Sequence, residues 1–286
     1  MTQSNSSKPI IGLVLAGGGA RGAYQVGVLK GISAMLPPGV ASPFKIICGA
    51  SAGAINATAL AIHARDFHEG VKRLNFVWKN FHVNQVFRAD GWGLFVTGAH
   101  WFAALALAGF GKRNPQALFD RAPLQQLLEQ NMPCDQLQAS IDAGALRALA
   151  VTALGYGTGE SVTFYQGIDS LEPWKRARRF GSACNITVDH MMASSAIPFF
   201  FSAVRLNSVY FGDGSMRQVA PISPALHLGA ERIFVIGVRY KAKEQAERFK
   251  PQEYPPLAQI AGHMLNSIFL DAIEADLERL QRLNHT

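Results

Sequence analysis

Two short apolar runs, each closed by glycine and followed by a helical pattern, constrain the fold of this chain more than any other feature. Residues 10–16 read IIGLVLA and run into three glycines, and residues 44–48 end at Gly49. Helical patterns follow at 23–35 and 52–64. Continuous apolar runs are typical of strands buried on both faces, and their alternation with helices predicts an α/β fold with a parallel sheet. Such folds place ligand chemistry at the carboxyl ends of the strands.

The rest of the chain continues this pattern less regularly. Further strands are predicted at 147–154, 161–165, 209–211 and 232–238, and further helices at 123–130, 188–195, 222–228 and 257–283. The pattern between about 65 and 147 is helical and irregular. Since neither an internal repeat nor a long linker occurs, we expect a single domain over 1–286, with a variable helical or lid insertion at about 67–119.

Composition narrows the classes of protein and partner. Hydrophobic residues make up 49% of the chain and charged residues 16%, which excludes a disordered chain. The net charge of +7 favours anionic partners. Only this charge supports a nucleic-acid function, since no known nucleic-acid recognition motif occurs. The three cysteines, Cys48, Cys134 and Cys184, are too scattered for a disulfide framework or a zinc site.

Two apolar segments allow more than one reading. Residues 91–111 carry no charged side chain but several glycines, which favours a core or lid segment over a membrane-contacting loop, and both over a membrane span. The helix at 257–283 has an apolar stripe opposite a face of mixed charge, which favours a solvated surface over an anionic bilayer.

The first apolar run ends in a glycine loop at 17–22, GGGARG, which fits the spacing G-x-G-x-x-G. Such loops direct backbone N–H groups at an anion, either a pyrophosphate or a developing oxyanion. A dinucleotide site should have an acidic residue after the second strand, but that strand ends at Cys48 and Gly49. A P-loop is also excluded, because no Gly-Lys-Ser/Thr follows.

The second apolar run leads into G-x-S-x-G at 49–53, centred on Ser51. A nucleophile on a sharp strand-to-helix turn needs small neighbours, because bulk two residues away would collide with the backbone. A glycine-flanked serine that only caps a helix would look the same. The position of the motif, one strand-helix unit after a glycine loop, favours a catalytic serine.

A catalytic serine needs a base, and the late histidines are poor candidates. His227 and His263 lie in helical patterns, and His285 is next to the last residue. Asp213 lies in the sequence FGDGS directly after a predicted strand, in a turn that admits close backbone approach. By itself this segment favours an ordinary Asp-Gly turn over a catalytic acid.

Together these residues resemble the patatin-like phospholipases. The resemblance rests on the glycine loop at 17–22, the G-x-S-x-G at 49–53, the Asp-Gly at 213–214 and the segment ASSAIPFFF at 193–201, all in the family's order. It covers about 10–228. It implies a three-layer α/β/α sandwich with a mostly parallel central sheet, and a serine lipid acyl hydrolase with a Ser-Asp dyad that needs no histidine.

Carried over by position, the resemblance makes Ser51 the nucleophile and Asp213 the base. It assigns the oxyanion hole to the loop residues Gly17, Gly18, Gly19, Arg21 and Gly22. Gly49 and Gly53 would flank the nucleophile, and Gly214 would belong to the loop of the acid. Two departures matter: Ser215 stands where the family usually has Gly or Ala, and 67–119 matches no family pattern, which leaves the substrate open.

Other functions remain open at this point. An acyltransferase or thioesterase would form the same acyl-enzyme, and a lipid- or nucleotide-binding module would keep the fold without turnover. The expected partner is a lipid or phospholipid, with peripheral contact to an anionic membrane through Lys175, Arg176, Arg178 and Arg179. A solvated basic face is an equal reading of these residues.

The sequence also bears on cofactors, oligomeric state and compartment. No cofactor or metal is expected, because no cluster of ligands with suitable spacing occurs. The sequence sets no oligomeric state. The polar start MTQSNSSKP lacks the features of a secretory signal, which predicts a cytoplasmic protein, with contact to the inner membrane and signal-independent secretion as alternatives.

Overall fold

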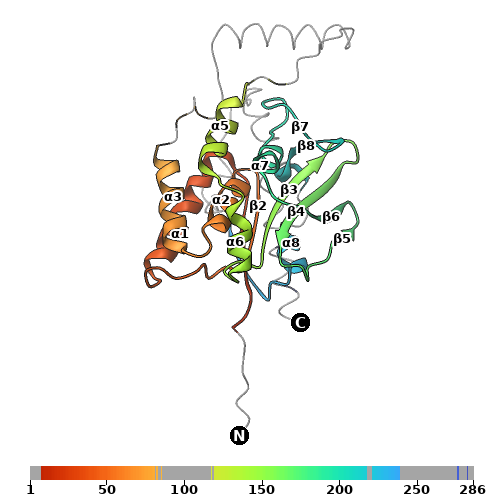
Figure 1. The fold of residues 1–286 in the computed structure, drawn as a ribbon. Helices are drawn as coiled ribbons and strands as arrows, with labels where there is room; N and C mark the ends of the chain where they lie inside the picture. Colours follow the sequence, from red (N-terminus) through yellow and green to blue (C-terminus); the bar gives the residue numbers. More distant parts are fainter. Residues whose placement is uncertain are drawn as a thin grey trace, which may run out of the picture.

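The computed structural model describes residues 8–80, 82, 85, 117, 119–217, 221–238, 276 and 282. A central β-sheet lies among helices (Figure 1). The strand order is β5-β6-β4-β3-β2-β1-β9, and β8 pairs with both β3 and β7. The α/β class predicted from the alternating pattern is confirmed.

The parallel half of the sheet consists of β9 (Arg232–Ile236), β1 (Ile11–Leu15), β2 (Ile46–Ala50) and β3 (Ala148–Gly155), adjacent in that order. All residues of β2 and β3 are buried, which explains why their sequences are continuous apolar runs. The predicted strands lie within two residues of these bounds.

The other half adds antiparallel pairs. β4 (Glu160–Gly167) runs antiparallel to β3, while β5 (Trp174–Arg176) and β6 (Arg179–Ala183) form a hairpin beside β4. β7 (Val204–Leu206) and β8 (Val209–Asp213) form a second hairpin. Strands were predicted at β4 and β8 but not at β5, β6 or β7, so the sheet is mixed, and the expected parallel order holds for β9 to β3.

Helices cover both faces of the sheet. Leu13 and Leu15 face a large core, whereas Val14 between them faces a second core with Ala225 and Leu228. The large core lies under α1 (Gly22–Ala34), α2 (Ala52–Ile62), α3 (Phe67–Lys79), α5 (Ala122–Asn131), α6 (Gln136–Asp142) and α7 (Val188–Ser194). The second core lies under α8 (Ser223–His227). The expected three-layer arrangement is therefore present.

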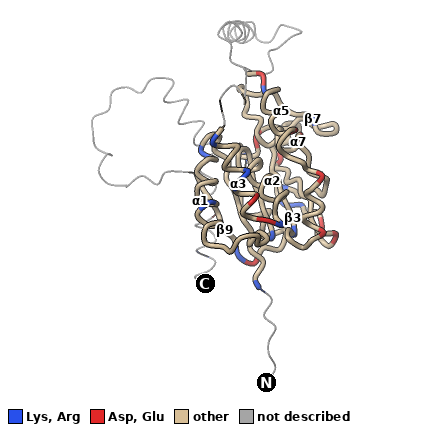
Figure 2. The backbone as a smooth tube through the Cα atoms, turned by 60° about the vertical axis from the view of Figure 1, so that its left-hand side comes forward, with Lys and Arg blue, Asp and Glu red and all other residues tan. Residues whose placement is uncertain are grey.

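Charge is sparse on this scaffold. Most of the tube in Figure 2 is tan, with short blue and red segments on several elements. On α3, Glu69 forms exposed ion pairs with Lys72 and Arg73. Exposed pairs of this kind contribute little to stability, so the fold depends mainly on its two apolar cores.

Several predicted segments lie wholly or partly outside the described residues. The insertion expected at 67–119 begins with α3, whose N-cap Asp66 accepts a hydrogen bond from the Glu69 N–H at 3.0 Å. The apolar segment at 91–111 and nearly all of the helix expected at 257–283 fall outside. Within the described part, no helix is both long and apolar enough to cross a bilayer.

The register of the sheet brings two distant strand ends together. β3 extends past the end of β2, since the last β2 residue, Ala50, pairs with Thr152. The next β3 residue, Ala153, pairs instead with Asp213, the last residue of β8. Because β2 runs parallel to β3 and β8 antiparallel, their carboxyl ends meet along β3. Ser51, which follows Ala50, is thereby set next to Asp213.

Candidate active site

Ser51 sits on a strained turn between β2 and α2. Its φ of 53° and ψ of −130° lie where a residue with a side chain is rarely found. A Cβ on Gly49 would fall on the Gly53 carbonyl, and a Cβ on Gly53 would fall on the carbonyl of Leu15. The two glycines thus allow the close packing that the G-x-S-x-G spacing predicted.

Ser194, at the end of α7, holds this turn by hydrogen bonds. The Ser51 N–H donates to Ser194 Oγ at 2.9 Å, and Ser194 Oγ donates to the Thr152 carbonyl at 2.6 Å. Ser194 is fully buried. The hydroxyl therefore ties the backbone of Ser51 to β3. In the sequence, Ser194 was noted only as part of the segment 193–201 that resembles the patatin-like family, and no role was predicted for it.

Asp213 ends β8 in a fully buried position, with 0% of its surface exposed. Its Oδ1 accepts a hydrogen bond from the Ser215 N–H at 2.8 Å, and its own N–H donates to the Ala196 carbonyl at 2.9 Å. A Cβ on Gly214 would fall on the Thr152 carbonyl, so only glycine fits after the acid. The Asp-Gly segment is thus a packed junction rather than an exposed hairpin turn.

Burial raises the pKa of Asp213 from an ordinary 3.8 to about 6, because desolvation penalises the charged form. Interactions with the Ser51 hydroxyl and with Ser215 oppose this rise and favour the carboxylate. Asp213 Oδ2 and Ser215 Oγ make no hydrogen bond of good geometry within the described chain. The carboxylate therefore keeps an unused acceptor beside Ser51.

The glycine loop lies next to Ser51 and Ser215. A Cβ on Gly17 would collide with Ser215 Oγ and lie 3.0 Å from Ser51 Cβ. Gly19, with a φ of 56°, lines the cavity beside Ser51 together with Ala20. The Arg21 N–H donates to the Gly18 carbonyl at 3.2 Å.

Not all of the predicted oxyanion residues offer a free N–H. The Gly22 N–H is directed at the carbonyls of Ala20 and Gly19, and the Arg21 N–H is engaged with Gly18. These two residues close the loop by internal bonds. This leaves the N–H groups of the first three glycines as the better candidates, because the internal bonds of the turn do not use them.

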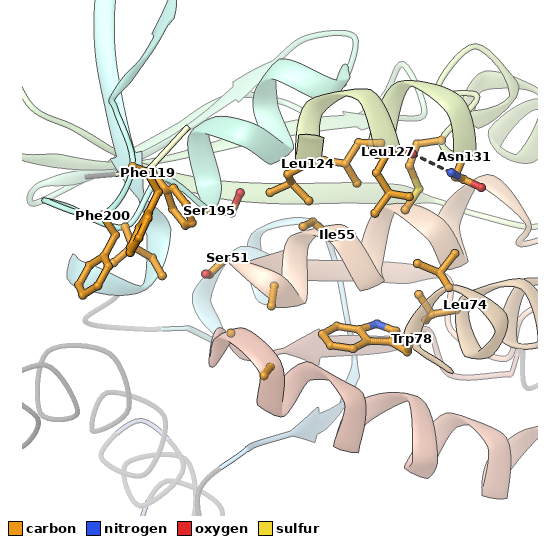
Figure 3. A pocket seen from close by; sticks show the side chains of 18 residues that line it. Ser51, Ile55, Leu74, Trp78, Phe119, Leu124, Leu127, Asn131, Ser195 and Phe200 are labelled. Atoms are coloured by element: carbon orange, nitrogen blue, oxygen red, sulfur yellow. Dashed lines mark hydrogen bonds between the residues drawn. The ribbon is translucent and has the colours of Figure 1, made fainter. Parts of the chain in front are cut away.

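A cavity of about 610 Å³ opens beside Ser51 (Figure 3). In this view Ser51 lies between the ring pair of Phe119 and Phe200 and the side chains of Ile55 and Leu124. The two rings stack with centroids 5.9 Å apart. Most of the remaining lining is aliphatic and comes from α2, α3 and α5: Ala52, Leu74, Val77, Leu127 and Leu128. The cavity suits a flexible hydrocarbon chain.

The histidines lie elsewhere or outside the described residues. His227 is on α8, on the other face of the sheet, where its ring stacks on Trp174 at 4.9 Å. His263 and His285 fall outside the described part. His190 caps α7 and contacts Cys184 at 3.6 Å. Of the ionisable residues singled out from the sequence as a base, Asp213 is the one that the β3 pairings place next to Ser51 in the described structure.

No metal-ligand cluster was predicted from the sequence. Across the described ranges, no group of three or more His, Cys, Asp or Glu side chains is arranged to hold a metal ion. Burial raises the pKa of the Cys48 thiol, and it raises that of Cys184 to about 11. Both thiols therefore stay protonated at neutral pH, which disfavours them as nucleophiles.

Comparison with known proteins identifies the family of the chain. The sequence model of the patatin-like phospholipases matches residues 13–226. A cGAMP-activated phospholipase of Pseudomonas aeruginosa (strain BWHPSA011 / Pa011) is 26% identical over 215 residues, which is 75% of this chain and 55% of that protein. The chain thus spans about half the length of this curated relative.

Solved structures give weaker likenesses. VipD of Legionella pneumophila has a TM-score of 0.43 at 17% identity, covering 73% of this chain and 46% of that one. ExoU of Pseudomonas aeruginosa, in complex with SpcU, has a TM-score of 0.30 at 18% identity, covering 55% and 35%. The family match extends from β1 through α8 and includes the glycine loop, the Ser51 turn and the Asp213 junction. On this match the chain belongs to the patatin-like phospholipase family.

Proposed function

We propose that this chain is a serine lipid acyl hydrolase that cleaves fatty-acyl esters of phospholipids or related lipids, with Ser51 as nucleophile and Asp213 as base. One observation carries the proposal: the carboxyl ends of β2 and β8 meet along β3, beside an apolar cavity that Ser51 lines. Membership of the family supports the same class of reaction.

In the acylation step, Ser51 Oγ attacks the ester carbonyl while its proton passes to Asp213 Oδ2. A pKa of about 6 leaves Asp213 mostly ionised at neutral pH, yet makes it a stronger base than an exposed aspartate. The C–O bond to the lipid alcohol then breaks, and the alcohol oxygen takes the proton from Asp213. The product is an acyl-enzyme on Ser51.

The tetrahedral oxyanion is stabilised by backbone N–H groups of the glycine loop. The position of Gly19 on the cavity wall beside Ser51 supports this assignment. Removing one donor of this kind lowers kcat by about 10²- to 10³-fold in comparable sites. Gly17, Gly18 and Gly19 are therefore expected to matter almost as much as the two side chains.

In the deacylation step, water attacks the acyl carbonyl and gives its proton to Asp213. Collapse of the second tetrahedral intermediate breaks the bond to Ser51 Oγ, which takes the proton back. A free fatty acid leaves, and the starting enzyme is restored. The cavity of about 610 Å³ holds the acyl chain through both steps.

A membrane supplies the substrate, and the β5–β6 hairpin is the proposed contact with it. Lys175, Arg176, Arg178 and Arg179 form no ion pair with the described residues. Arg179 pairs with Ser161 near the start of β4, so the turn of the hairpin lies at the edge of the sheet where β3 ends. Each cation near an anionic surface contributes about 1 kcal/mol.

Covalent labelling and product analysis test the dyad. A fluorophosphonate should label wild-type Ser51, and Ser51→Ala should abolish both labelling and release of fatty acid from phospholipid vesicles. Asp213→Asn should lower kcat by at least about 10²-fold, because the amide cannot take the proton. Both variants should retain a cooperative unfolding transition. Near-normal activity of Asp213→Asn would refute the assignment of the base.

A further inference from the structure

Three buried side chains form a polar network beneath the glycine loop. Gln25 on α1 and Asn56 on α2 are both fully buried, and Trp78 on α3 is partly buried. Asn56 Nδ2 donates to Gln25 Oε1 at 2.8 Å, and Trp78 Nε1 donates to Asn56 Oδ1 at 2.8 Å. The network therefore joins the three helices that lie on one side of the loop.

The network leaves its members no alternative arrangement. Asn56 Nδ2 also donates to the Gly22 carbonyl at 3.1 Å, so both of its N–H groups are used. Gln25 Nε2 donates to the carbonyls of Ala16 at 2.7 Å and Ile236 at 3.4 Å. A buried network in which every donor is satisfied has one favoured geometry, since any rotation strands a polar group.

The two carbonyls that the network holds lie at the two ends of the glycine loop. Ala16 directly precedes Gly17, and Gly22 is the last glycine of the loop. Gln25 fixes the first of them, and Asn56 fixes the second. Four of the six loop residues are glycines, which have no side chain to hold the loop in place. Their direction therefore depends on the network below.

The other end of the network lies in the cavity. The Trp78 indole lines the cavity on the α3 side, as seen in Figure 3. A Cβ on Gly22 would lie 2.9 Å from Trp78 Cζ2, so the ring packs directly against the end of the loop. An occupant of the cavity thus contacts a ring that packs on Gly22 and hydrogen-bonds to Asn56.

We propose that Gln25, Asn56 and Trp78 are positioning residues that couple filling of the cavity to the geometry of the glycine loop. The enzyme then selects acyl chains through kcat more than through KM. This inference rests on the proposed function, which assigns the oxyanion to the loop and the acyl chain to the cavity. A long chain holds the Trp78 ring against Gly22, and a short chain leaves the ring without support on its cavity side. Binding energy of the chain is then used in the transition state.

The test compares the hydrolysis of p-nitrophenyl laurate and p-nitrophenyl butyrate. Trp78→Phe keeps an aromatic ring in the cavity but removes the donor to Asn56. We expect the ratio of the two kcat values, laurate over butyrate, to fall about tenfold, the size expected for one buried hydrogen bond. The KM values should change less than twofold. An unchanged kcat ratio would overturn the inference.

Two further variants give the test its controls. Ser140→Ala removes one buried hydrogen bond outside both the cavity and the network, and should keep the wild-type kcat ratio. Gln25→Met removes the donors to Ala16 and Ile236 and the acceptor of Asn56, and should lower the kcat ratio as Trp78→Phe does, because either change breaks the link between the ring and the loop. An equal fall of the kcat ratio in Ser140→Ala would show that loosening of the fold alone sets it, and would refute the network.

Fluorophosphonate labelling separates this inference from the proposed function. If wild-type Ser51 is not labelled, the proposed function fails, and with it the basis of the inference. If Ser51 is labelled and Trp78→Phe keeps the wild-type kcat ratio, only the inference fails. If Trp78→Phe has lost its cooperative unfolding transition, the Gln25→Met result decides: a fall of the kcat ratio supports the inference, and an unchanged ratio overturns it.

Discussion

The main chain of Ser51 is held in a conformation that serine adopts only at a cost of about 1–3 kcal/mol. Such strain persists only where surrounding contacts enforce it. Here the contacts are the packing of Gly49 and Gly53 and the bond from the Ser51 N–H to Ser194 Oγ. The proposed nucleophile therefore depends on a second serine that takes no part in bond-making.

Ser194→Ala tests this dependence. The change leaves the Ser51 N–H and the Thr152 carbonyl without their buried partner, so we expect the unfolding free energy to fall by about 1–3 kcal/mol. The proposed hydrolase kcat should fall about tenfold or more, because the turn can relax. Denaturant unfolding and single-turnover kinetics measure the two effects.

Ser140→Ala is the matched control for that experiment. Ser140 is equally buried and donates a single hydrogen bond to the Ile62 carbonyl at 2.9 Å, outside the site. It should lose similar stability and keep its kcat. If Ser194→Ala also kept its kcat, the hydrogen bond from the Ser51 N–H to Ser194 Oγ would contribute to stability only.

The buried carboxyl of Asp213 sets an expected pH dependence. The proposed base works when ionised, so kcat/KM should rise with pH through about 6 and level off above it. Burial raises the pKa of this carboxyl, and the Ser51 hydroxyl together with the N–H and hydroxyl of Ser215 lowers it. Tyr156 is an ionisable neighbour, and its pKa is raised by burial and by the charge of Asp213.

Ser215→Ala should move that acid limb. Without the hydroxyl, the carboxylate loses a favourable neighbour, the pKa of Asp213 rises, and the limb shifts to higher pH. A pH profile of kcat/KM with a water-soluble ester measures the shift. A limb that stays in place, or moves to lower pH, would show that Ser215 does not act on the base.

At the scale of elements, the turn of the β5–β6 hairpin has a backbone conformation that is unfavourable for the residue found there. Arg178 has a φ of 55°, which favours glycine. Arg178→Gly should therefore leave the hairpin as stable or more stable. It should weaken sedimentation with anionic vesicles about fivefold, the effect of one cation near the surface.

A charge-matched variant on another element controls that measurement. Lys30→Gln removes one exposed cation from α1 and should leave vesicle binding within twofold of wild type. Equal losses in both variants would mean that net charge, not the hairpin, drives binding. Binding of Arg178→Gly equal to wild type would remove the hairpin from the proposal.

The elements that the sequence predicted best are those whose residues are buried on both faces. β1, β2 and β3 are continuous apolar runs, and such runs have few alternatives. β5, with the sequence WKR, and β7, with VRL, are three residues long and polar in part. Their strand state comes from pairing with β6 and β8, which no local pattern reveals.

For the whole molecule, the order of motifs predicted the fold family but not the contacts that make the site. Ser51 and Asp213 were singled out from short segments far apart in the chain, and the sheet brings them together. The roles described for Ser194 and Asn56 had no sequence signal of their own. Each is an ordinary polar residue in a helix, and its partner is fixed only when the helices pack.

The meeting of β2 and β8 along a single strand has a consequence for how such a protein can diverge. The spacing of Ser51 and Asp213 is set by two adjacent pairings on β3, Thr152 with Ala50 and Ala153 with Asp213. Loops elsewhere between the two residues can lengthen, shorten or be exchanged without altering that spacing. New regulatory or substrate-selecting segments can therefore be grafted onto the scaffold while its proposed reaction centre is inherited unchanged.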